Sequence, residues 1–86
     1  MAKKATRSRG KFVVQVQNFT EGNGLARILD GGVGGVKDRR AAGRLAFYWL
    51  YDNGHAVRPE ATRLAAKLEE GGSVDAGRFR LTITEQ

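Results

Sequence analysis

The chain has 86 residues, contains no cysteine and carries a formal net charge of +6 at pH 7. A chain of this length forms one domain and buries only about two thirds of its unfolded surface, which disfavours a deep enclosed active site. Without cysteine there are no disulfides, thiolate nucleophiles or Cys-ligated zinc sites. The N-terminus lacks the apolar run of a secretory signal, and no stretch of about 20 apolar residues could span a bilayer, so the sequence predicts a soluble cytoplasmic protein with no membrane partner.

Most of the net positive charge lies in the first eleven residues, which contain five basic and no acidic side chains, whereas the remainder contains 10 basic and 9 acidic ones. This segment is small, polar and cationic, so we expect a disordered basic tail over residues 1–11 and a single folded domain over residues 12–86. A second basic cluster follows at residues 37–44. These two regions are where an anionic partner would be attracted.

The N-terminal third of the domain reads as a strand followed by turns. Apolar and polar side chains alternate in residues 12–19, with Phe12, Val14 and Val16 expected on the buried face. Residues 20–24 have turn chemistry. The apolar spacing of residues 25–30 fits either a strand or a helix, and this question stays open. Four glycines in residues 31–36 predict a flexible connection.

Residues 38–53 are the best helix candidate, with Asp38 as the N-cap and Gly54 as the left-handed residue that ends the helix. Gly43 inside the helix lowers its stability by roughly 1 kcal/mol relative to alanine, which indicates a close backbone contact. One face is apolar and predicts the core side: Ala41, Ala42, Leu45, Ala46, Trp49 and Leu50. Another face carries a basic and aromatic stripe: Arg40, Arg44, Phe47 and Tyr51.

A second helix and a strand complete the chain. Pro59 fits the first helical turn, Gly71 and Gly72 end the helix, and its narrow apolar stripe is Ala61, Leu64, Ala65 and Leu68. Residues 78–84 alternate cleanly as a strand, and residues 73–77 are expected to pair with it as a short hairpin arm.

Together these elements predict an α+β fold, in which a small antiparallel sheet of two or three strands carries two helices on one face, in the order β(β)ααβ. The strands at 12–19 and 78–84 are expected side by side. If the first of them lay at a sheet edge it would be free to pair with a second copy, so homo-oligomer formation stays open. The other sheet face is expected to show Gln15, Gln17, Arg78, Arg80 and Thr82.

No catalytic or cofactor signature is present. His55 is the only histidine, has no nearby nucleophile to activate, and is expected to be a loop side chain that partly covers the core. The carboxylates are scattered, and no metal-ligand spacing occurs. The glycine-rich run at 31–36 lacks the spacing of a phosphate-binding loop. We therefore expect a non-enzymatic protein without a metal or cofactor.

Nucleic-acid binding is the function that these features favour, with DNA and RNA both open. A cationic tail can follow a phosphate backbone, and the helix stripe adds arginines for phosphates and aromatic rings for unpaired bases. The candidate contact residues are Lys3, Lys4, Arg7, Arg9, Lys11, Lys37, Arg39, Arg40, Arg44, Phe47, Tyr51, Arg78 and Arg80.

The alternative is a small inhibitor or adaptor of phage or mobile-element type, which would occupy a surface on a host nucleic-acid-processing complex. Aromatic residues and arginine are enriched at the centres of protein interfaces. One helix supplies both kinds: Arg40, Arg44, Phe47, Tyr48 and Tyr51.

Overall fold

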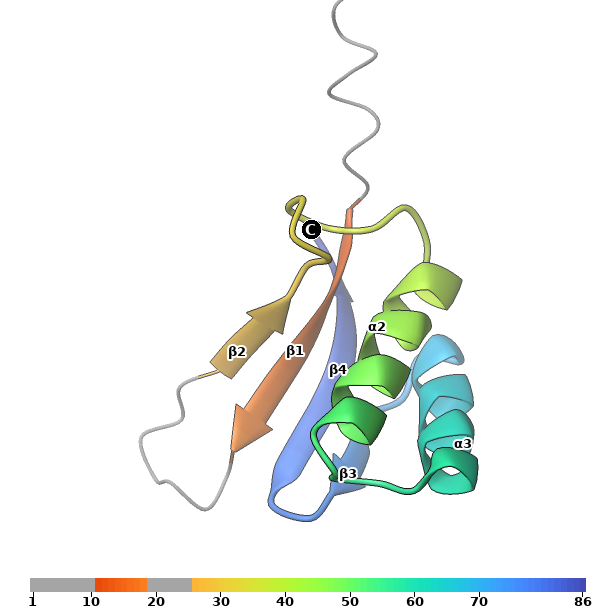
Figure 1. Ribbon diagram of the computed structural model, residues 1–86. Coiled ribbons are helices and arrows are strands. Elements are labelled where there is room, and N and C mark those ends of the chain that lie inside the picture. The colour runs from red at the N-terminus through yellow and green to blue at the C-terminus, as the bar shows by residue number, and fades with distance from the viewer. Residues whose placement is uncertain (1–10, 19–25) are drawn as a thin grey trace, which may run out of the picture.

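A four-stranded antiparallel sheet with two helices on one face forms the domain (Figure 1). The computed structural model describes residues 11–18 and 26–86, and every structural statement below concerns these residues. The elements are β1 (Phe12–Asn18), β2 (Ala26–Leu29), α2 (Arg39–Asp52), α3 (Arg58–Glu69), β3 (Val74–Ala76) and β4 (Phe79–Glu85). The predicted α+β class is confirmed, with one strand more than the upper estimate. Residues 1–10 of the expected tail and the expected turn at 20–24 lie outside the described residues.

The sheet order is β2-β1-β4-β3, which places the long strands β1 and β4 side by side at the centre. Residues 25–30, left open by the sequence, contribute β2, and the short hairpin arm is β3. Because β1 pairs with β2 through Val14–Leu29 and with β4 through Val14–Ile83, it is an internal strand and offers no free edge. The described sheet therefore ends in its two short strands, β2 and β3.

The hairpin between β3 and β4 corrects the predicted position of Arg78. Ala76 pairs with Phe79, so Gly77 and Arg78 form the turn and the strand begins at Phe79. Gly77 has φ +61°, a conformation that glycine adopts without steric cost and that suits a tight hairpin turn. Arg78 is thus an exposed turn residue and does not belong to the outer face of the strand.

The core lies between the sheet and the two helices, and α2 covers β1 and β4 while α3 covers β4 and β3. On this face, buried side chains recur at every second position along the strands, as predicted. The fully or nearly fully buried core side chains are Val14, Val16, Leu81, Ile83, Val74 and Ala76 from the sheet and Ala42, Ala46, Leu50, Ala61, Leu64 and Leu68 from the helices.

Fewer side chains of the predicted α2 core face are fully buried than the sequence predicts. Ala42, Ala46 and Leu50 are completely buried, whereas Leu45 and Trp49 are only partly buried at the margin of the core. The small alanines let the helix approach the sheet closely, and a ring as large as Trp49 then packs beside the contact. Its indole lies against Phe79, with ring centroids 5.1 Å apart in an edge-to-face arrangement.

One strand residue departs from the predicted alternation. The register places Val13 opposite Thr84, on the sheet face that the helices do not cover, yet only 2% of Val13 is exposed. On the same face, Ile28 of β2 pairs with Gln15 and is 49% exposed. This face therefore contains apolar as well as the expected polar residues.

The glycine-rich connection, which its composition predicts to be flexible, forms a hydrogen-bonded turn. The Asp30 carbonyl accepts from the N–H groups of Val33 and Gly35, and its carboxylate accepts from Gly32 at 2.8 Å. Val36 then exchanges two backbone hydrogen bonds with Phe12. Glycine supplies the positive φ angles that this turn needs.

Candidate binding surface

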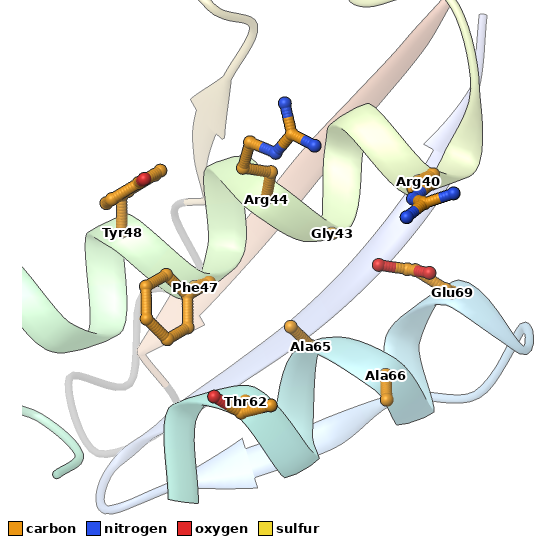
Figure 2. Close-up of a pocket in the computed structure, with 9 residues that line it drawn as sticks. All are labelled: Arg40, Gly43, Arg44, Phe47, Tyr48, Thr62, Ala65, Ala66 and Glu69. Atoms are coloured by element: carbon orange, nitrogen blue, oxygen red, sulfur yellow. The ribbon is translucent and has the colours of Figure 1, made fainter. Parts of the chain in front are cut away.

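An open groove of about 330 Å³ runs between the outer sides of α2 and α3 (Figure 2). We call it the helix groove. It brings together the predicted basic and aromatic stripe of α2 and a set of α3 side chains. Its lining residues are Arg40, Gly43, Arg44, Phe47, Tyr48, Thr62, Ala65, Ala66 and Glu69.

The α2 wall of the groove is basic towards the start of the helix and aromatic towards its end. Arg40 and Arg44 are exposed and lie roughly one helical turn apart. The ring of Phe47 meets Tyr48 edge-on at 5.2 Å, and Tyr51 stacks on it at 5.9 Å with an interplanar angle of 11°. Arg40, Arg44 and Phe47 of the predicted stripe thus line the groove, and Tyr51 lies just beyond it against Phe47.

Neither Arg40 nor Arg44 has an ion-pair partner within the described part of the chain. The ion pairs there are Lys11 with Glu85, Arg63 with Glu60 and Arg80 with Asp75. In this region the two groove arginines have no carboxylate within 4 Å to neutralise them. Both are available to an anionic group of a partner.

The floor of the groove is built from small residues where the two helices come close. Gly43 is buried, and a Cβ atom added to it would lie 2.6 Å from Cγ and 2.9 Å from Cδ of Glu69. The close contact that the sequence predicts at Gly43 therefore exists, and its partner is the Glu69 side chain. Glycine at this position lets that side chain lie across α2 and hold its carboxylate in the groove (Figure 2).

We expect Gly43→Ala to leave the free energy of unfolding within about 1 kcal/mol of the native value, because two effects oppose each other. Alanine raises the helix propensity of α2 by roughly 1 kcal/mol, whereas its methyl group displaces Glu69. The displaced atoms are the end of a flexible side chain, so the displacement costs little. Equilibrium unfolding in urea measures the change. A loss above about 2 kcal/mol, the scale of core overpacking, would show that Glu69 cannot move.

Several predicted contact residues are instead used within the fold. Arg39 donates from Nε to the Glu69 carbonyl at 3.3 Å, and its guanidinium lies 5.8 Å from the centre of the Phe12 ring. Arg39 therefore ties the start of α2 to the end of α3 and to the sheet. It is only partly exposed, in contrast to its neighbour Arg40.

On the uncovered sheet face, Arg80 donates two hydrogen bonds to Asp75, its cross-strand neighbour, at 2.8 Å and 3.3 Å. These bonds hold the pKa of the Asp75 carboxyl below its usual value and raise the pKa of Arg80. The negative charge of Asp75 thus offsets the positive charge with which Arg80 was expected to attract a partner. The structure does not bring Arg78 or Arg80 into the helix groove.

The two predicted lysines that the structure describes, Lys11 and Lys37, lie outside the groove as well. Lys11, the last residue of the expected tail, is hydrogen-bonded into the domain through Val36 and Gln86, and its amino group lies 3.9 Å from Glu85. Lys37 is exposed just before α2. Lys3, Lys4, Arg7 and Arg9 lie outside the described residues.

The start of α2 is not arranged as a phosphate site. The Asp38 carboxylate accepts from the Ala41 N–H at 2.8 Å, which confirms the predicted cap and places a negative charge at the helix N-terminus. In the preceding loop, three N–H groups already donate to Asp30. These contacts work against a bound anion at this point.

His55 lies against the margin of the core, as predicted. Its ring is 4.6 Å from Trp49 and 4.7 Å from Phe79, measured between ring centroids. Within residues 11–18 and 26–86, no three side chains of the types His, Cys, Asp and Glu gather into a group that could hold a metal ion.

Sequence reasoning missed the α3 wall of the groove. Thr62 is followed at intervals of three and four residues by the adjacent Ala65 and Ala66, and these at the same intervals by Glu69, which is the signal of a helix face. Most of these residues are small. The sequence places Ala65 in the core stripe and does not predict Glu69 as a site residue. Only the packing of α3 on α2 shows that this face meets Gly43.

Comparisons with protein-family models, with curated proteins and with solved structures gave no match. In the described part of the chain, neither helix has the length and apolar character needed to cross a membrane.

Proposed function

We propose that this protein is a small, non-enzymatic nucleic-acid-binding protein whose helix groove contacts the ligand. The observation that carries the proposal is the pair of exposed arginines, Arg40 and Arg44, beside the aromatic cluster of Phe47, Tyr48 and Tyr51. Guanidinium groups bind phosphates through strong charge-assisted hydrogen bonds. Aromatic rings stack on bases that are not paired.

The order of these side chains along α2 suits a single strand. The Cα atoms of Arg40 and Arg44 are about 6 Å apart along the helix axis, and their long side chains can reach neighbouring phosphates of one strand. The aromatic cluster begins one turn further on. A strand that crosses the groove can thus place phosphates on the arginines and its bases on the rings, whereas paired bases are already stacked within a duplex.

The basic N-terminal segment adds attraction that depends on charge alone. Lys3, Lys4, Arg7 and Arg9 contribute four positive charges that no acidic residue in the segment balances. Such a segment raises the rate and strength of association with any polyanion. In this proposal it supplies general affinity, and the helix groove supplies the contacts to bases.

The alternative function is that of a small protein-binding inhibitor or adaptor. It is favoured by the exposure of Tyr48 and Tyr51, which are 53% and 45% accessible on the outer side of α2. Large exposed aromatic side chains flanked by arginine are characteristic of protein interfaces. The partner would then present an acidic surface to Arg40 and Arg44.

Fluorescence anisotropy with single-stranded DNA, single-stranded RNA and duplex DNA, over a salt series, tests the proposal. We expect micromolar or tighter binding to a single strand at about 150 mM salt. We also expect the logarithm of affinity to fall with the logarithm of salt concentration, with a slope that becomes shallower by about 3 when residues 1–10 are removed. Absence of binding beyond a weak signal that depends on residues 1–10 would contradict the proposal and favour the protein-binding alternative.

A further inference from the structure

We infer that the helix groove takes an unpaired guanine base and that Glu69 recognises its Watson–Crick edge. This inference rests on the proposed nucleic-acid binding and names the base that the groove prefers. It starts from an unusual feature of the site. Glu69 places a carboxylate in a groove whose other lining side chains are mostly basic, aromatic or small. A carboxylate repels phosphates, so general backbone binding gives no reason for its presence.

Glu69 is held in the groove by the way the helices pack. The absence of a side chain at Gly43 lets the Glu69 side chain lie across α2 (Figure 2). Glu69 is the last residue of α3 and is partly buried, and its backbone carbonyl accepts a hydrogen bond from Arg39. Among the described residues its carboxylate takes part in no ion pair and no hydrogen bond, so both oxygens can accept from a ligand.

The chemistry of a carboxylate selects guanine among the bases. An ionised carboxylate only accepts hydrogen bonds, and its two oxygens can accept from two adjacent donors. Guanine presents such a pair on its Watson–Crick edge, the N–H of its ring and the amino group beside it. Adenine and cytosine each present one donor next to an acceptor, and thymine and uracil present one donor between two carbonyls. Against a carboxylate, each of these acceptors is repulsive.

The rest of the groove fits a planar base held in this way. Ala65, Ala66 and Gly43 line the groove without bulky side chains, and its volume of about 330 Å³ is at the lower end of the range for small-ligand sites. Phe47 lies one turn beyond Gly43 and offers its ring to the base. Arg40 and Arg44 both come from α2. Figure 2 shows the Arg40 guanidinium near Glu69, whose charge it can offset, and Arg44 directed away from α3, where it can hold a flanking phosphate.

The test compares short all-thymine oligonucleotides that differ at one central position, which carries guanine, hypoxanthine, adenine or thymine. Hypoxanthine is guanine without the amino group. For the full chain we expect the guanine oligonucleotide to bind about tenfold more tightly than the all-thymine one, as a bidentate contact to a base provides. The hypoxanthine oligonucleotide is expected to lose most of this preference, because it keeps only one of the two donors.

Three variants locate the effect. Glu69→Gln is expected to remove the guanine preference while binding the all-thymine oligonucleotide at least as tightly as the native protein does. Gly43→Ala keeps every charge but displaces the Glu69 carboxylate, so it should lose the preference too. Glu70→Gln makes the same change of charge at an exposed neighbour that does not line the groove, and it should keep the preference.

The outcomes separate this inference from the proposed function. Equal binding of the guanine and all-thymine oligonucleotides would overturn the inference and leave nucleic-acid binding intact. A guanine preference that persists in Glu69→Gln would likewise overturn it, because Glu69 would then act only as a repelling charge. If the full chain binds none of the oligonucleotides, the proposed function fails together with the inference, and a protein partner takes its place.

Discussion

Replacing Leu50 by alanine is expected to lower the free energy of unfolding by about 3 kcal/mol, within the range of about 2 to 5 kcal/mol that Leu→Ala changes cost in well-packed cores. Leu50 is completely buried on the sheet side of α2. The change removes its contacts and leaves a cavity that the surrounding side chains fill only in part. For a domain of this size the whole stability is roughly 4 to 13 kcal/mol, so a large share would be lost.

The stability loss of Trp49→Ala, compared with that of Leu50→Ala, shows which of the two side chains is closer to the centre of the core. The sequence predicts Trp49 on the core face of the helix and a loss of about 3 to 5 kcal/mol on its removal if the side chain is buried. The structure places it at the margin, where its ring contacts His55 and Phe79 and is only partly buried. We therefore expect Trp49→Ala to cost less than Leu50→Ala, although it deletes a larger side chain.

Equilibrium unfolding in urea, followed by circular dichroism, measures both variants, since the fluorescence signal disappears with the only tryptophan. A larger loss in Trp49→Ala than in Leu50→Ala would show that the centre of the core lies towards Phe79. Unchanged stability in Leu50→Ala would contradict the burial of that face of α2.

Most of the fold could be predicted from the periodic spacing of apolar residues. Alternation in β1 and β4 and the apolar stripes of α2 and α3 each reflect which side of an element is buried, a property that depends on neighbouring residues in the chain. Residues 25–30 were ambiguous because so short an apolar segment fits both periods. For the glycine-rich loop, composition shows that glycine permits positive φ, but it does not show that Asp30 accepts hydrogen bonds from the loop.

The binding surface was less accessible to sequence reasoning because it depends on contacts between elements. Arg39 and Arg40 are adjacent and chemically identical, and only packing shows that the first bonds to the end of α3 while the second is exposed in the groove. Arg80 is engaged by Asp75 because the turn at Gly77 sets the register of the hairpin. The role of Glu69 requires the packing of α3 against Gly43.

The double replacement Arg40→Ala with Arg44→Ala is expected to weaken binding of a single strand by up to about 100-fold without unfolding the domain. A charge-assisted hydrogen bond contributes about 1.5 kcal/mol, or tenfold, and the two arginines hold separate phosphates in the proposed complex. Both side chains are exposed and neither forms an ion pair in the described part of the chain, so their removal leaves the described contacts of the core in place.

The matched control for this variant is Arg58→Ala with Lys67→Ala, which removes the same charge from exposed positions of α3 outside the groove lining. Anisotropy titrations over a salt series distinguish a local from a general electrostatic effect. Loss of two phosphate contacts should make the salt slope shallower by about 1.4 for a single strand, whereas the control should change it much less. Equal weakening in both variants would mean that the helix groove has no special role and that net charge alone attracts the nucleic acid.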